Sequence, residues 1–135
     1  GTVRSFAPEV RDKIECRVRQ LVEGISIAMD VKAELDFQRH YPAVVNDEEC
    51  TRKVVASLHK VLDSSELERM NDPVMIGEDF AYFLQKVPGV FLFLSNPQGQ
   101  NGEFYPHHHP RFDIDEKQLT LGVTAFVQTA LDFLQ

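Results

Sequence analysis

The chain has 135 residues, of which 43% are hydrophobic and 26% charged, a composition typical of folded globular proteins. Its formal net charge is −7 and its pI is about 5.1, so we expect neither a nucleic acid nor a membrane as a partner, because anionic phosphates would be repelled. No apolar stretch is long enough to cross a bilayer, and the two cysteines, Cys16 and Cys50, do not make a disulfide framework. We therefore expect a reducing, cytoplasmic location.

The first 41 residues predict a strand, a helix and a second strand. Residues 1–6 (GTVRSF) are short and favour a strand, and Pro8 stands where a first helical residue is expected. Residues 31–38 alternate between apolar and polar side chains, which predicts a half-buried strand. Between these strands, apolar residues recur at steps of three and four and predict one face of an amphipathic helix: Val10, Ile14, Val18, Leu21, Ile25 and Met29.

The remaining sequence predicts three further helices and one buried strand. A capping-box sequence, Asn46–Glu49 (NDEE), predicts a helix start with Asn46 as the N-cap. A short helix is expected to begin after Gly77, and the continuously apolar run 89–94 (GVFLFL) predicts a strand covered on both faces. The last helix, within residues 115–134, is broadly apolar, so we expect it to lie buried against a sheet.

Three adjacent histidines are the clearest candidates for metal binding. His107, His108 and His109 lie between Pro106 and Pro110, and histidine is the commonest metal ligand near neutral pH. Adjacent residues on an extended loop point in different directions, so one ion would take one or two of these rings. A zinc ion needs three or four protein ligands, and the others must come from elsewhere. The alternative is that the histidines are a surface-loop feature without a ligand.

Other polar residues have structural explanations beside functional ones. Arg4 could bind a substrate carboxylate through its planar guanidinium, although solvation of a strand residue explains it as well. Glu78 and Asp79 stand at a predicted helix start, where capping is the ordinary explanation, while Gly77 would let a ligand approach the backbone closely. The isolated histidines are expected to be structural: His40 and His59.

The order of four motifs resembles the C-terminal part of the M20 metallopeptidase family: GTVRSF, AELDFQRHYPAVVND, VMIGEDFAYFLQKVPGVFLFL and HHHPRFDIDE. The closest likeness is to its amidohydrolase branch of hippurate hydrolases, N-acyl-amino-acid amidohydrolases and auxin-conjugate hydrolases. The resemblance implies an α/β fold, in which a two-metal catalytic domain is interrupted by a smaller lid or dimerisation domain with a ferredoxin-like α+β sandwich. Residues 1–44 would be the strand–helix–strand half of that lid, and residues 45–135 the C-terminal part of the catalytic domain.

The resemblance also implies roles for individual residues. His108, two places before Pro110, matches a metal ligand of the family. The preceding position is usually apolar in relatives and is His107 here, so the register stays open and His107 and His109 remain candidates. Arg4 matches an arginine that binds the substrate carboxylate in some relatives, and three residues match a stretch that lines the active-site cleft: Gly77, Glu78 and Asp79. Of these, Arg4, Gly77 and Glu78 are the expected substrate-binding residues.

The chain lacks the remaining catalytic parts of such an enzyme, so we expect no catalytic residue in it. It has no HxCGHD motif and no paired-glutamate motif, which in the family supply the other ligands and the general base. Because it begins at Gly1 rather than Met, we expect a piece of a longer parent, inactive by itself. That parent would hydrolyse the amide bond of hippurate-like N-acyl amino acids with two divalent metal ions. The ions would be zinc by default, with manganese, cobalt or nickel as alternatives. The parent would form a homodimer through the lid. The alternative is a non-catalytic interaction or dimerisation module that pairs through strand edges at residues 1–6 and 31–41.

Overall fold

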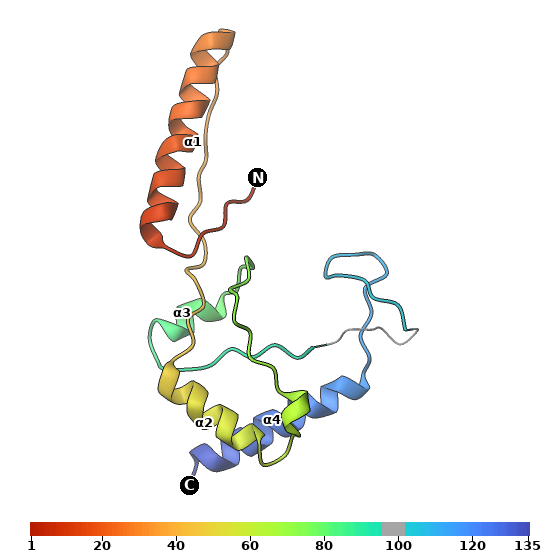
Figure 1. Cartoon of the computed structure of the whole chain (residues 1–135). Helices are drawn as coiled ribbons and strands as arrows, with labels where there is room; N and C mark the ends of the chain where they lie inside the picture. The colour runs from red at the N-terminus through yellow and green to blue at the C-terminus, as the bar shows by residue number, and fades with distance from the viewer. Residues whose placement is uncertain (96–101) are drawn as a thin grey trace. The chain divides into compact units, whose positions relative to one another are not determined.

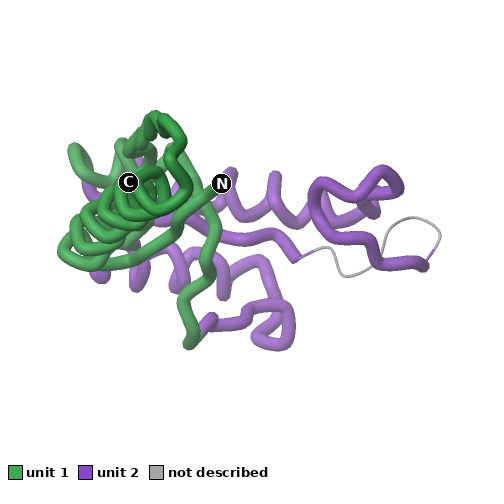
Figure 2. The backbone as a smooth tube through the Cα atoms, turned by 90° about the horizontal axis from the view of Figure 1, so that it is seen from above, with its two compact units in different colours: residues 1–45, 71–87 green, residues 46–70, 88–135 purple. Residues whose placement is uncertain are grey.

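The computed structural model describes residues 1–95 and 102–135, and in those ranges it contains four α-helices and one short 3-10 helix (Figure 1). The elements are α1 (Pro8–Met29), α2 (Glu48–Leu58), the 3-10 helix η1 (Ser64–Glu66), α3 (Phe80–Leu84) and α4 (Lys117–Phe133). The chain divides into two compact units that alternate along the sequence (Figure 2). Unit 1 comprises Gly1–Val45 and Asn71–Val87, and unit 2 comprises Asn46–Met70 and Pro88–Gln135.

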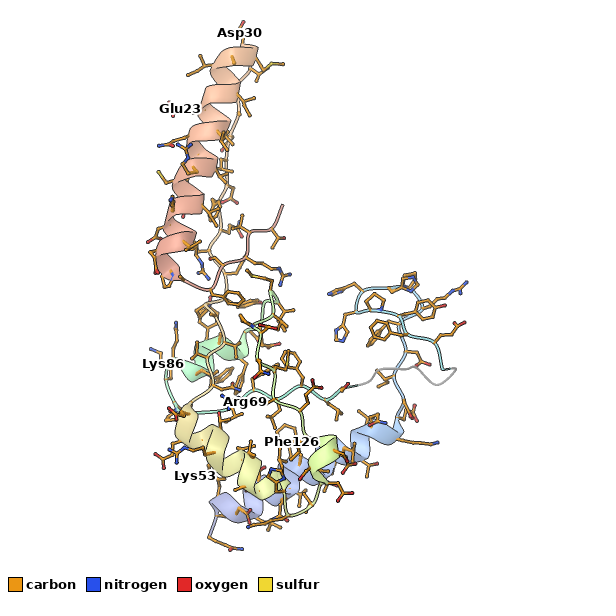
Figure 3. All side chains as sticks on the ribbon, in the orientation of Figure 1. Glu23, Asp30, Lys53, Arg69, Lys86 and Phe126 are labelled. Carbon is orange, nitrogen blue, oxygen red and sulfur yellow. The ribbon has the colours of Figure 1, made fainter. Side chains whose placement is uncertain are left out.

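Helix α1 confirms the helix predicted from apolar spacing and from Pro8. Pro8 occupies the first helical position, after Ala7 in an extended conformation. The helix ends where Asp30 adopts a left-handed backbone conformation with φ of 50°. The N–H of Asp30 bonds to the carbonyl of Ile27 and the N–H of Val31 to that of Ser26, which is the Schellman arrangement that satisfies terminal carbonyls. Figure 3 labels Asp30 at this end of the helix.

The chain that follows α1 runs back alongside it and is held there by charged side chains (Figure 1). Arg39 bridges two carboxylates of the helix, with Nη2 2.6 Å from Oε2 of Glu15 and Nη1 2.6 Å from Oδ1 of Asp12. In the opposite direction, Nη2 of Arg11 on the helix donates to the backbone carbonyl of Tyr41 at 2.6 Å. These bonds fix the returning segment on the N-terminal half of α1.

The predicted strands are wrong, and with them the α/β fold and the strand–helix–strand half of a ferredoxin-like lid. No strand occurs in the ranges 1–95 and 102–135. Leu35 and Phe37 are half-buried while their neighbours are exposed, so the alternating side chains do face two ways. A strand also needs hydrogen bonds to a neighbouring backbone, and residues 31–38 and 89–94 have no such ladder. The assignment of residues 1–44 and 45–135 to two functional domains stays a prediction.

Unit 2 is organised around the packing of α2 against α4. The buried side chains of α2 are Val54, Ser57 and Leu58. At the edge of this contact, Nζ of Lys60 lies 2.8 Å from Oδ2 of Asp132 on α4. The small apolar contact and the ion pair together position the two helices within this unit.

Helix α4 does not lie buried against a sheet, which corrects the expectation from its apolar sequence. None of its residues is buried, and Phe126, labelled in Figure 3, is 80% exposed. The helix therefore contacts α2 along one side and keeps large apolar side chains in solvent. Within the described ranges, no helix combines the length and the apolar character that a membrane crossing requires.

The start of α2 is capped one residue later than predicted. Asp47 is the N-cap, and its carboxylate accepts a hydrogen bond from the N–H of Cys50 at 2.8 Å, which lowers the pKa of Asp47. The side chain of Asn46 instead binds both backbone groups of Phe91, accepting from its N–H at 2.8 Å and donating to its carbonyl at 3.0 Å. Asn46 thus ties the start of α2 to the segment that follows α3.

Candidate functional site

Two residues predicted to bind substrate lie together in unit 1. A Cβ atom built on Gly77 would lie 3.8 Å from Nη1 of Arg4 and 3.5 Å from Cδ2 of Tyr41. Arg4 is exposed, and within the described ranges its guanidinium forms no ion pair or hydrogen bond. Its donors are therefore free to bind a planar anion such as a carboxylate.

Tyr41 is a member of this cluster that the sequence did not reveal. Its ring contacts the ring of Tyr82 on α3 edge to face, with centroids 5.8 Å apart. The Tyr41 ring and the Arg4 guanidinium therefore both lie next to Gly77. The only sequence signal was an aromatic residue immediately before Pro42, which does not show what the ring contacts.

Glu78 and Asp79 stand at the start of α3, as predicted, and within the described residues neither carboxylate forms an ion pair or hydrogen bond with Arg4. Oε1 of Glu78 accepts a long hydrogen bond of 3.4 Å from the N–H of Phe80, and Glu78 is half-buried. Asp79 is the N-cap residue but its side chain makes no capping bond. In the part of the chain that the structure describes, Glu78 is therefore explained by its local backbone contact.

Two consecutive turns shape the histidine loop, by which we mean residues 103–112 of unit 2. The N–H of His109 bonds to the carbonyl of Pro106 at 3.1 Å and closes the first turn. His108, its third residue, has φ of 69°, as in a type II turn. The N–H of Phe112 bonds to the carbonyl of His109 at 2.9 Å and closes the second turn. His109 therefore belongs to both turns.

The three imidazoles have different surroundings. The ring of His107 packs against Phe112, with centroids 4.8 Å apart. The ring of His109 stacks on Tyr105 at 4.5 Å, and its Nδ1 accepts from the N–H of Arg111 at 3.1 Å. His108 is exposed, and among the described residues its ring has neither a hydrogen bond nor a ring contact. The loop thus presents one free imidazole between two packed ones.

The residues around His109 form a polar network that sequence reasoning missed. The hydroxyl of Tyr105 lies 2.8 Å from Oε2 of Glu103, to which it donates, and accepts from Nη1 of Arg111 at 3.2 Å. The guanidinium of Arg111 also lies over the Tyr105 ring, 5.9 Å from its centroid. The His-Pro-Arg sequence was a signal for the second turn, but the stacked ring was not readable from spacing.

The loop suits one metal-ligand position but does not complete a metal site. No group of three or more His, Cys, Asp or Glu side chains that could hold an ion occurs in the described ranges. A zinc ion requires three or four protein ligands, so His108 could serve only as one of a set. The other candidate residues do not extend this set: His40 contacts Tyr41 and His59 follows α2 as its C-cap.

The comparison with protein families places most of the chain in one family model. The model of peptidase family M20/M25/M40 matches residues 4–132. One relative is thermostable carboxypeptidase 2 of Saccharolobus solfataricus, which is 36% identical over 98% of this chain and 33% of its own length. Another is N-acetyl-L-cysteine deacetylase of Bacillus subtilis, which is 38% identical over 86% of this chain and 26% of its own length. The chain spans about a third or less of the curated relatives it matches.

A solved structure supports the same relationship. The crystal structure of an aminohydrolase candidate from methicillin-resistant Staphylococcus aureus matches with a TM-score of 0.67 and 34% sequence identity. The match covers 93% of this chain and 32% of that protein. The sequence relatives and the solved structure thus each match over most of this chain.

Proposed function

Because the chain belongs to peptidase family M20/M25/M40, we propose that the protein which carries it hydrolyses the amide bond of N-acyl amino acids such as hippurate. The family makes it a hydrolase. The two names reported above, a deacetylase of N-acetylcysteine and a carboxypeptidase, both describe cleavage of an amide bond next to a residue with a free carboxylate. A binding group for that carboxylate is therefore the feature expected in this chain.

The observation that carries the proposal is the free guanidinium of Arg4 beside Gly77. A carboxylate of the substrate would bind the fork of Arg4 in a bidentate way, with the ring of Tyr41 as a neighbouring wall. Gly77 leaves the approach to Arg4 open, because it has no side chain of its own. Glu78, also proposed to line the cleft, would contribute the backbone at this position rather than its carboxylate.

Enzymes of this family generally depend on two metal ions. We propose that His108 is the ligand that this chain contributes, and that the metal is zinc, with manganese, cobalt or nickel as alternatives. Such ions would polarise the scissile carbonyl and lower the pKa of a bound water. The exposed, free ring of His108 supports this choice over His107 and His109.

We further propose that the 135-residue chain by itself is inactive, that the protein is cytoplasmic, and that residues 1–44 mediate a homodimer.

The second candidate function is a non-catalytic interaction or dimerisation module. One observation favours contact through residues 1–44 under either function: α1 exposes Leu21, Ile25 and Met29 at helical spacing, with exposed fractions of 58%, 59% and 67%. A hydrolase and a module differ in whether the protein at its natural length turns over substrate.

The test compares this chain with the protein at its natural length. Both would be assayed for release of free amino acid from hippurate, N-acetylcysteine and a dipeptide, after chelation and after adding back Zn²⁺, Mn²⁺, Co²⁺ or Ni²⁺. Hippuramide, the matched control, keeps the scissile benzoyl amide but lacks the carboxylate, and its cleavage is followed by release of benzoate and glycinamide. We expect metal-dependent hydrolysis of hippurate by the longer protein, weaker hydrolysis of hippuramide, and no turnover by the chain alone.

Two results would contradict these proposals. Turnover by the purified 135-residue chain would show that it holds a complete catalytic site. A natural-length protein that cleaves no N-acyl amino acid with any of the four metals would exclude the proposed reaction and favour the module.

A further inference from the structure

The hydrogen bond at His109 decides which of its ring nitrogens carries the proton. Nδ1 accepts from the backbone N–H of Arg111 at 3.1 Å, so Nδ1 holds the lone pair and the proton of the neutral ring lies on Nε2. An imidazole that binds a metal uses its lone pair for the ion and its other N–H for a neighbouring acceptor. His109 could ligate a metal through Nε2 only by changing tautomer, which would leave the Arg111 N–H without its acceptor.

The ring of His109 is fixed in a second way by stacking on Tyr105. The two rings are nearly parallel, with an interplanar angle of 13° and centroids 4.5 Å apart. Tyr105 is itself held through its hydroxyl by Glu103 and by Nη1 of Arg111. Both the backbone and the side chain of Arg111 therefore support the same pair of rings.

His109 is also the residue that joins the two turns. Its N–H closes the turn that contains His108, and its carbonyl closes the turn that ends at Phe112. Holding the ring and backbone of His109 consequently restrains the residue immediately before it. His108 keeps φ of 69°, a left-handed conformation that few non-glycine residues adopt without such restraint.

We propose that His109 is a positioning residue: its Nδ1, which accepts from the Arg111 N–H and so fixes the Nε2–H tautomer, holds His108 in the left-handed conformation, and His109 is not itself a metal ligand. The consequence for metal binding rests on the proposed function of His108. The restraint on the loop does not, because it follows from contacts within residues 103–112.

Two substitutions separate the hydrogen bond from the stacking. His109→Asn removes the stacked ring, but an asparagine oxygen commonly accepts from the N–H two residues later and so replaces Nδ1. His109→Phe keeps an aromatic ring on Tyr105 and removes the acceptor. His107→Phe is the matched control, because it keeps an aromatic contact with Phe112 and touches neither turn bond.

The measurement is NMR of the natural-length protein selectively labelled with ¹⁵N-histidine and ¹⁵N-arginine. Long-range ¹H–¹⁵N correlations report the tautomer of each neutral ring. An intense cross-peak between the amide and Hα of residue 108 marks positive φ, and amide exchange at Arg111 reports its hydrogen bond. We expect His109 of the wild type to be the Nε2–H tautomer. The residue-108 cross-peak should be strong in the wild type, in His107→Phe and in His109→Asn. In His109→Phe this cross-peak should be weaker, and the Arg111 amide should exchange several-fold faster.

Binding of Zn²⁺ alone is measured on the same proteins by calorimetry. We expect His109→Phe to weaken Zn²⁺ binding by about tenfold or more, as residues that orient a ligand typically do, while His109→Asn retains it. A Nδ1–H tautomer of His109, or a His109→Phe protein with an unchanged residue-108 cross-peak, would overturn the positioning role. If His108→Ala leaves Zn²⁺ binding unchanged, the proposed metal role fails, and the tautomer and amide signals still decide the positioning role.

Discussion

Arg4 is the residue of unit 1 that is expected to bind the substrate carboxylate. Its free guanidinium lies beside Gly77, and hydrogen bonds to a charged group are each worth about 1.5–3 kcal/mol. We predict that Arg4→Gln raises KM for hippurate roughly tenfold to a hundredfold and leaves the KM for hippuramide nearly unchanged. Steady-state kinetics on the natural-length protein with the two substrates would measure both values.

The control for charge is Arg17→Gln, which removes another exposed arginine of unit 1 that bonds only to Gln20 among the described residues. It should leave both KM values unchanged.

Two substitutions at Gly77 test whether this position must stay open for the approach to Arg4. Alanine would meet Arg4 and Tyr41 at ordinary contact distances, whereas valine would extend further toward them. An equal effect of Arg4→Gln on hippurate and hippuramide would show that Arg4 does not bind the carboxylate.

At the same scale, the candidate site was only partly predictable. The three histidines and Arg4 could be selected from their residue types and their place in the motifs. What distinguishes His108 from its neighbours depends on Tyr105 and Arg111, whose ring and backbone contacts follow from two turns rather than from spacing. Local sequence does not encode which of three adjacent side chains remains free.

At the scale of elements, the contact between α2 and α4 contains an acid-sensitive ion pair. The Lys60 ammonium, followed by the Ser57 hydroxyl, lowers the pKa of Asp132. Because the pKa of Asp132 is lower in the folded chain, its stabilising effect is present above the unfolded carboxyl pKa of about 3.9 and is lost as the pH falls through the folded value. We predict that Asp132→Asn lowers the thermal midpoint of the helices at neutral pH by a few degrees and reduces its dependence on acid, measured by circular dichroism.

The comparison variant for this pair is Glu49→Gln, which removes an ion pair with Lys53 on the surface of α2. The Glu49 side chain is 64% exposed and the Asp132 side chain 16% exposed, so solvent screens the first pair more strongly. We expect a smaller change for Glu49→Gln. Equal acid dependence of wild type and Asp132→Asn would show that this pair does not stabilise the helix contact.

The elements also show where sequence reasoning succeeds and fails. Helix α1 was predictable because Pro8 and apolar steps of three and four are local signals. The N-cap of α2 is Asp47 and not the predicted Asn46, although both residue types are good caps. The Asn46 side chain instead binds the backbone of Phe91, 45 residues away. The strand predictions were wrong for a similar reason. Alternation of apolar and polar residues indicates which way side chains point, whereas a strand also requires hydrogen bonds to a partner backbone.

At the scale of the whole molecule, little apolar surface is buried within the described chain. Three apolar side chains in the described ranges are buried: Val54, Leu58 and Ala81. This core is small, because a folded protein of this length ordinarily buries about two thirds of the surface that its unfolded chain exposes. Large apolar side chains remain exposed on α1 and α4. Since most helical stability in proteins comes from packing of an apolar face, these helices are expected to gain stability from further protein surface.

The proposed homodimer supplies such a surface for α1, and it can be tested with two glutamates placed on opposite sides of the helix. Ile25 lies in the exposed row with Leu21 and Met29, while Ile27 is 76% exposed but points away from that row, because two residues correspond to about 200° of helix rotation. We predict that Ile25→Glu converts the natural-length protein from dimer to monomer and that Ile27→Glu leaves it dimeric. Light scattering after size-exclusion chromatography measures the mass of each. Because both changes add the same charge to the same helix, dissociation by both would indicate general destabilisation, and a wild-type monomer at micromolar concentrations would exclude the dimer.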